Sequence, residues 1–206
     1  LELIGRGCAA VTFNQRSIAE ILQMIRMLGG LVGLADRAEP LAARLEAGLT
    51  AIRESAARFP RRPRVFFEEW DDPLISGIRW VDELIEIAGG DTLFPEHRPA
   101  ALAKDRIVSP DRVRDAAPDT IVASWCGKKV NKSRIAGRSG WAEVPAVRDG
   151  HIYEIKSTYI LQPGPASLTE GVTQLHWLLG RVVGIVPDAS ISPQEHVDSQ
   201  NAGWRA

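Results

Sequence analysis

Residues 41–70 read LAARLEAGLTAIRESAARFPRRPRVFFEEW, and the spacing of their apolar residues changes at the two prolines. Before the prolines, apolar residues recur every three or four positions, at Leu41, Leu45, Leu49, Ile52, Ala56 and Phe59. This period predicts an amphipathic helix over 36–58, about 34 Å long at 1.5 Å per residue. Asp36 and Glu39 have capping-box spacing at its start. After the prolines, RVFFEEW (64–70) predicts a strand.

Strands and helices alternate from residue 64 onward. Two more strands are predicted at TIVASW (120–125) and HIYEI (151–155). The last helix is predicted to begin near Ser167, with Glu170 in the capping-box position. Its buried face would be Val172, Leu175, Leu178, Leu179 and Val182, and that of an earlier helix Val81, Leu84, Ile85 and Ala88. This order predicts an α/β lobe with a mostly parallel sheet.

The segment before residue 36 carries a weaker version of the same pattern. AVTF (10–13) predicts a short strand, and 16–29 predict a helix whose apolar residues follow a 3.6-residue period. The polar tail from Asp188 shows no periodicity and is expected to be frayed. No run reaches the roughly 18 apolar residues of a membrane span, and no signal peptide is visible after Leu1.

Composition narrows the class of protein. The 206 residues are 45% hydrophobic and 25% charged, which is typical of a globular chain. A net charge of −1 disfavours a nucleic-acid binder. The four histidines are scattered without metal-ligand spacing, so no metal site is expected.

Aromatic residues gather where the predicted strands end. Trp70, Trp80, Trp125 and Tyr159 lie in or just after strand-end loops. Ligands of parallel sheets bind beyond these ends, and the rings suit a broad, flat ligand. Each aromatic alone is also compatible with an ordinary core position. The acids around Trp70, which are Glu68, Glu69, Asp71 and Asp72, are candidates for polar ligand contacts or a solvated strand end.

Cys126 is the one candidate nucleophile. It follows a predicted strand and lies close to Lys128 and Lys129, whose charges could lower its pKa. No histidine is near it in the sequence to serve as a base. An ordinary loop cysteine explains the same pattern.

The order of several segments resembles the class III periplasmic binding proteins of ABC importers, and within them the cobalamin-binding branch. Its relatives also serve iron–siderophores and haem. The resemblance covers residues 7–186 and is carried by GIRWVDELIEIAGG (77–90), IVSPDRV (107–113), AAPDTIV (116–122), GWAEVPAVRDGHIY (140–153) and QPGP (162–165).

The resemblance implies two Rossmann-like lobes joined by a long helix, with the ligand between them. Residues 1–33 would be the end of the N-terminal lobe, 34–59 the interlobe helix, 60–187 the C-terminal ligand-binding lobe and 188–206 a flexible tail. The fold class is therefore α/β, with one complete lobe, a long interlobe helix and a remnant of a second lobe. This chain would hold one wall of the cleft.

The resemblance also implies which residues face the ligand. Carried over by position, they are Trp70, Asp71, Asp72, Trp80, Trp125, Lys128, Tyr159 and Gln162. Some relatives have a cation where this chain has Gln162. Asp111 matches an acidic residue that docks on the transporter.

The sequence thus favours a substrate-binding component of an ABC importer that carries cobalamin or another corrinoid, with no enzyme activity and no bound cofactor besides that ligand. Its partners would be a membrane permease and an ATPase. The expected location is the periplasm or the cell surface, with a cytoplasmic location left open. An iron–siderophore or haem carrier is the first alternative, and a Cys126-dependent enzyme on this scaffold is the second.

Overall fold

The computed structural model describes residues 5–187 and 191–193. Its strands are β1 (Arg64–Asp71), β2 (Leu74–Ser76), β3 (Asp91–Thr92), β4 (Thr120–Ala123) and β5 (Ile152–Glu154). Its helices are α2 (Ile18–Leu31), α3 (Ala35–Ala56), α4 (Arg79–Ala88), α5 (Pro110–Asp115), α6 (Lys132–Ala136), α7 (Pro145–Arg148), α8 (Ser157–Ile160) and α9 (Val172–Val182). Two 3₁₀ turns (Pro95–His97 and Ala103–Arg106) and a π-helical turn (Ser167–Gly171) complete the described chain.

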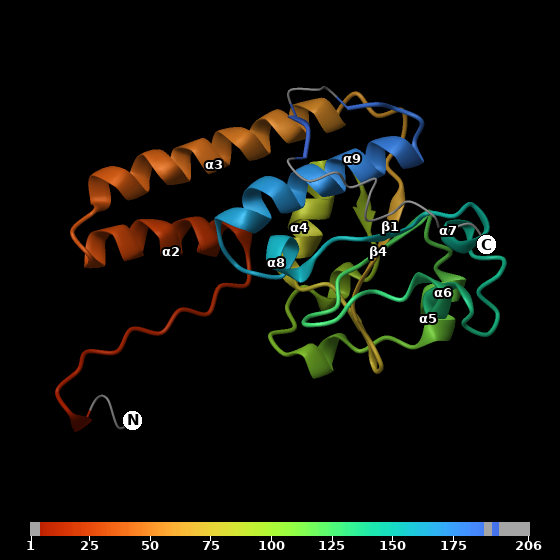
Figure 1. Ribbon diagram of the computed structural model, residues 1–206, viewed down its shortest axis with the longest axis horizontal. Helices are drawn as coiled ribbons and strands as arrows, with labels where there is room; N and C mark the ends of the chain where they lie inside the picture. Colours follow the sequence, from red (N-terminus) through yellow and green to blue (C-terminus); the bar gives the residue numbers. More distant parts are fainter. Residues whose placement is uncertain (1–4, 188–190, 194–206) are drawn as a thin grey trace.

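The sheet is mostly parallel, as predicted. Its order is β2-β1-β4-β5, with β3 beside the first half of β1. β1 runs parallel to β3 and β4, and β4 runs parallel to β5. β2 folds back antiparallel on the end of β1 (Figure 1). The ends of β1, β4 and β5 therefore lie at one edge.

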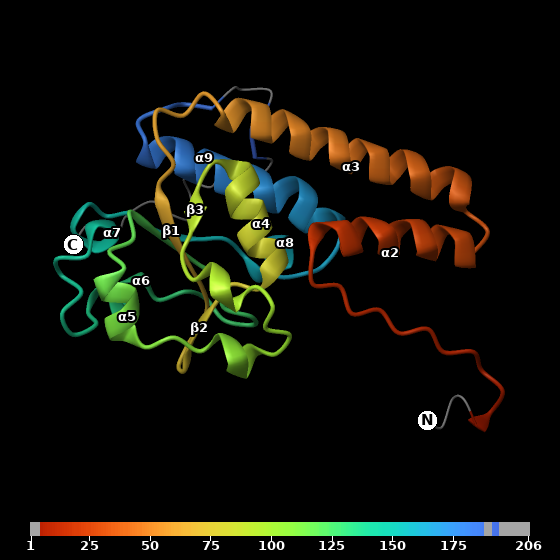
Figure 2. The same ribbon diagram turned by 180° about the vertical axis from the view of Figure 1, so that it is seen from behind.

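Alternation along the strands divides the core into two clusters. Val65 and Phe67 of β1 and Val122 of β4 pack under α3, α4 and α9. Phe66 and Ile121 point the opposite way and pack against α5, α6 and α7. Figure 2 shows these helices on the two faces of the sheet. Because successive side chains of a strand point to opposite faces, both layers are specified by the strand sequences.

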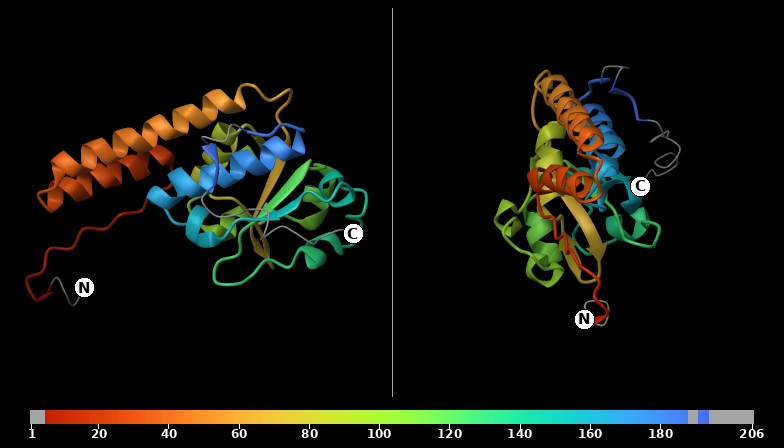
Figure 3. Two further views of the ribbon diagram at one scale, coloured as in Figure 1. Left: turned by 45° about the horizontal axis from the view of Figure 1, so that its top comes forward. Right: turned by 90° about the vertical axis from the view of Figure 1, so that its left-hand side faces the viewer.

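The long helix is confirmed, with slightly different ends. α3 covers 22 residues and buries the predicted Leu45, Leu49 and Ile52. It runs antiparallel to α2, and this pair of helices extends beyond the sheet (Figure 3).

The predicted strand over 10–13 is wrong. These residues are irregular, and Val11 is 54% exposed. In the described ranges, no strand lies beside them to pair with their backbone, and a strand without such a neighbour is not stable in water. The tail prediction, apart from residues 191–193, lies outside the described residues.

Both predicted capping boxes are also wrong. Leu34 is the N-cap of α3, and Glu39 pairs with Arg26 of α2 instead, at 2.8 Å. The Ser167 hydroxyl donates to the Gly164 carbonyl at 2.9 Å, inside a helix that is already under way. Val182, expected in the core, is only half-buried. Spacing alone did not identify these caps, because helix starts depend on the preceding backbone.

Candidate ligand-binding site

The site lies where β1 and β4 end side by side. Glu68 of β1 is opposite Ala123 of β4, and the Ser124 N–H donates to the Glu68 carbonyl at 2.9 Å. Beyond this pair the two strands separate. β1 continues into the β1–β2 hairpin, and β4 is followed by residues 124–141. The side chains of both segments meet at this edge of the sheet.

Glu68 fixes the start and the end of the segment after β4. Its fully buried carboxylate accepts the Trp125 indole N–H at 3.1 Å and two hydrogen bonds from Arg138, at 2.6 and 2.9 Å. Arg138 in turn lies over the ring of the buried Trp141, 4.7 Å from its centroid. Burial raises the pKa of Glu68, whereas Arg138 and the Trp125 N–H favour its charged form. This network holds the Trp125 ring in one orientation.

Asp71 is the second acid of β1 that faces this segment. Its side chain is 1% exposed and pairs with Lys128 at 2.6 Å and with Arg134 at 2.9 Å. Burial alone would raise the pKa of Asp71, but the hydrogen bond and charge of Lys128, together with Arg134, hold that pKa below its usual value. Asp71 is therefore a carboxylate with two cations, which are 41% and 54% exposed.

Lys128 lies between two indole rings. Its Nζ is 4.2 Å from the centroid of Trp70 and 4.9 Å from that of Trp125. The Trp70 indole N–H donates to the Asp72 carbonyl at 3.0 Å, so this ring is also held. We call Trp70, Asp71, Trp125 and Lys128 the aromatic–lysine cluster. Trp70 is half-buried and Trp125 only 4% exposed.

The structure thus brings together four of the eight ligand-facing residues expected from the sequence. Asp72 adjoins them and is exposed. Trp80 lies elsewhere: it is 5% exposed, belongs to the core under α3 and α9, and donates its indole N–H to the Ile160 carbonyl at 3.0 Å. Tyr159 is half-buried against that same core, and Gln162 is exposed after α8.

Sequence reasoning missed the roles of Arg134 and Arg138 and of Glu68 as an anchor. A signal was present, because five cations and no acid occur between residues 126 and 142, at Lys128, Lys129, Lys132, Arg134 and Arg138. Such a run after a strand, facing acids that end the neighbouring strand, indicates ion pairs across the sheet edge. Cys126, the candidate nucleophile, is exposed and is not in a disulfide.

Comparison with known proteins identifies the family of the chain. A family model described as periplasmic binding protein matches residues 1–159. The chain belongs to the periplasmic binding protein family.

Three relatives show how similar the chain is to known proteins in sequence and in fold. The uncharacterized ABC transporter substrate-binding lipoprotein YvrC of Bacillus subtilis (strain 168) is 25% identical over 185 residues, which are 84% of this chain and 54% of YvrC. The chain therefore spans about half the length of that curated relative. The apo structure of the periplasmic heme-binding protein RhuT from Roseiflexus sp. RS-1 is 26% identical with a TM-score of 0.73, over 88% of this chain and 70% of RhuT.

The third relative is the periplasmic vitamin B12 binding protein BtuF of Vibrio cholerae. It is 20% identical with a TM-score of 0.64, and the match covers 88% of this chain and 68% of BtuF. Its likeness concerns the fold. The expected resemblance to class III periplasmic binding proteins is confirmed, and the shared fold does not single out the cobalamin branch.

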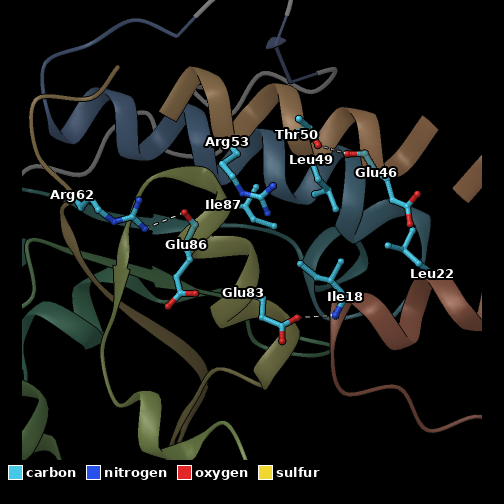
Figure 4. A pocket seen from close by; sticks show the side chains of 10 residues that line it. All are labelled: Ile18, Leu22, Glu46, Leu49, Thr50, Arg53, Arg62, Glu83, Glu86 and Ile87. Atoms are coloured by element: carbon cyan, nitrogen blue, oxygen red, sulfur yellow. Dashed lines mark hydrogen bonds between the residues drawn. The ribbon is translucent and has the colours of Figure 1, made fainter. Parts of the chain in front are cut away.

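A groove of about 600 Å³ marks where α2 meets the rest of this periplasmic binding protein. It opens between α2, α3 and α4, and Figure 4 shows its side chains. Glu83 of α4 accepts the backbone N–H of Ile18, the first residue of α2, at 2.8 Å. The groove shares no residue with the aromatic–lysine cluster. We regard it as a junction between elements.

Among the described residues, no helix combines the length and the hydrophobicity that a membrane-crossing segment requires. Within the same ranges, no three His, Cys, Asp or Glu side chains gather in a way that could hold a metal ion.

Proposed function

We propose that this protein is the substrate-binding component of an ABC importer. Membership in the periplasmic binding protein family supports this, as does YvrC, which is described as an ABC transporter substrate-binding lipoprotein. Its partners would be a membrane permease and an ATPase, and its place the periplasm or the outer face of the cell membrane. It would bind and release its ligand without chemical change.

The domain arrangement belongs to the same proposal. The outward side of α2 and the turn after it expose apolar side chains, at Met27, Leu28, Leu31, Val32 and Leu34. Exposed apolar side chains that gather in one part of a chain typically mark an interaction surface. We assign residues 1–33 to a first lobe, 34–59 to the interlobe helix and 60–187 to the second lobe, which supplies one wall of the ligand cleft.

The aromatic–lysine cluster is the observation that carries the ligand class. Two indole rings, each held by a hydrogen bond, and cations at one sheet edge suit a flat ring with polar substituents. We propose a tetrapyrrole. Cobalamin or another corrinoid is the candidate that the resemblance of the sequence favours, whereas the charges of the site favour a ring with carboxylates. Trp70, Asp71, Asp72, Trp125 and Lys128 would contact it, with Tyr159 and Gln162, which follow β5, as further contacts. Trp80, expected to be a ligand contact, is buried in the core and is left out of this proposal.

Haem is the second candidate. Lys128 and Arg134 are partly exposed cations beside the rings, and such cations suit the carboxylates of haem or of a ferric siderophore better than the amides of a corrinoid. RhuT, whose sequence is 26% identical, is described as a heme-binding protein.

The absorption spectrum of the protein purified with its native ligand tests this proposal, because corrinoids, haem and ferric siderophores absorb differently. Titration of wild type and Trp70→Ala with cyanocobalamin and with haemin then measures how much the Trp70 ring contributes to ligand affinity. We expect Trp70→Ala to weaken binding about tenfold or more. Trp177→Phe, on α9 and outside the cluster, is the control. Purified protein that binds no tetrapyrrole would contradict the ligand class.

A further inference from the structure

The side chain of Lys128 covers the indole faces on which a ring ligand would stack. Its Nζ lies 4.2 and 4.9 Å from the centroids of Trp70 and Trp125, and it is held there by Asp71 at 2.6 Å. A flat ligand therefore cannot reach both rings while Lys128 keeps this position.

Lys128 is also the residue of the aromatic–lysine cluster that is best placed to move. Its side chain is 41% exposed. It follows Gly127, whose φ of 76° lies in the left-handed region that glycine adopts without strain. By contrast, the Trp125 ring is fixed by the buried Glu68. A lysine on a four-carbon stem can leave the rings by rotating its side chain.

Departure of Lys128 leaves no isolated buried charge. Asp71 is 1% exposed and would be costly to leave without a cation. Arg134 pairs with its other oxygen at 2.9 Å and can remain there. Because Arg134 stays paired with Asp71, Lys128 can leave without creating an unpaired buried carboxylate.

We propose that Lys128 is a specificity-determining residue: it occupies the faces of Trp70 and Trp125 until a carboxylate of the ligand draws it away. A ring with carboxylate substituents replaces the lost Asp71 ion pair with a new one to Lys128. A ring with only amide or ester substituents must displace Lys128 without that compensation. The site therefore selects carboxylate-bearing rings over their neutral counterparts. This inference rests on the proposed tetrapyrrole-binding function.

The test uses pairs of ring ligands that share the macrocycle and differ at its edge. These are cobyrinic acid with cobinamide, and iron(III) protoporphyrin with its dimethyl ester. Their dissociation constants are measured by absorbance titration for wild type, Lys128→Ala and Lys129→Ala. Lys129 is the matched control, because it is the exposed neighbour with the same charge and lies outside the hydrogen bonds and ion pairs described for the cluster.

We expect wild type to prefer the carboxylate member of the pair that it binds. Lys128→Ala should reduce this preference about tenfold, because neutral rings no longer displace a lysine and carboxylates no longer gain one. Lys129→Ala should keep the wild-type preference within about twofold.

Carbon-13 NMR of the Lys128 ε-methylene provides a second readout. Between two indole rings, this signal should be shifted upfield in the free protein, and bound ligand should return it to the position of an exposed lysine. A signal at the exposed position in the free protein would overturn the proposal. Binding with an equal preference in wild type and Lys128→Ala would overturn it while leaving the tetrapyrrole function intact. Failure of all four ligands to bind any variant would overturn both.

Discussion

At the scale of single residues, the acids of β1 show how burial decides what a carboxylate does. Glu68 is fully buried, and its guanidinium partner Arg138 is itself mostly buried, so this pair is a fixed anchor. Asp71 is equally buried, but its partners Lys128 and Arg134 reach solvent. One acid therefore positions a ring, and the other presents two cations.

Asp82 gives a residue-scale prediction outside the site. It is buried in α4, accepts the Thr92 hydroxyl at 2.9 Å and lies 3.6 Å from Arg98. Burial raises its pKa from 3.8 to about 7, opposed by Thr92 and Arg98. Between about pH 4 and 7 the unfolded chain loses this proton while the folded protein keeps it, so the free energy of unfolding falls as pH rises.

Asp82→Asn should remove this contribution, which is at most about 4 kcal/mol for three pKa units. Urea unfolding of wild type and variant at several values between pH 4 and 7.5 gives the difference curve. The variant should lose less stability than wild type as pH rises. Parallel curves for the two proteins would show that folding does not raise the pKa of Asp82.

At the scale of elements, the α2–α3 pair depends on one close approach. A Cβ at Gly29 would lie 2.2 Å from the Cβ of Ala38, whereas one at Gly30 would meet nothing within 4 Å. Gly29→Ala should therefore destabilise the protein by about 1–3 kcal/mol through overpacking. Gly30→Ala should stabilise it by about 0.5–1 kcal/mol, because alanine favours the helix. Thermal unfolding that shifts both variants in the same direction would contradict this packing.

The long helix α3 gives a second prediction at this scale. Leu45 and Leu49 are buried on the side that faces the rest of the protein. Leu45→Ala or Leu49→Ala should each lower the free energy of unfolding by about 2–5 kcal/mol, because each leaves a cavity. Arg44→Ala, at an exposed position of the same helix, should change it by less than about 0.5 kcal/mol. If both leucine variants had the same free energy of unfolding as wild type, α3 would not be part of the core.

At the scale of the whole molecule, the residue expected to dock on the transporter, Asp111, has no ion pair with the described residues of the aromatic–lysine cluster. Asp111 lies in the first turn of α5, is 75% exposed and pairs with Arg114 at 2.6 Å. Its role in docking on the transporter follows from the family resemblance and stays a prediction. Asp115 pairs with the same arginine at 2.9 Å and is 68% exposed, so it is a matched control.

Asp111→Ala should weaken association with the reconstituted permease, because it removes an exposed charge from the docking surface, and it should leave the ligand dissociation constant unchanged. Asp115→Ala should affect neither. Surface plasmon resonance against the transporter in nanodiscs measures the first quantity, and absorbance titration measures the second. Equal effects of the two variants on association would contradict a specific role for Asp111.

The local pattern of helices and strands is visible in the amino-acid sequence alone. The apolar runs VFF and TIVA predicted two strands of the sheet, and the 3.6-residue stripe through Leu45 and Leu49 predicted α3. A helix and a strand each place their side chains with a fixed period along the chain, so both can be recognised from the order of residues. The family resemblance was carried by the order of these same segments.

Which aromatic rings form one site depends on contacts between distant parts of the chain. Trp125 is oriented by Glu68 and Lys128 by Asp71, and each pair is separated by 57 residues along the chain. Trp80 also follows a strand along the chain, but it lies in the first turn of α4, packs in the core and donates its N–H to a carbonyl 80 residues away. Spacing along the chain does not fix such contacts, since they form only when parallel strands bring their distant ends to one edge.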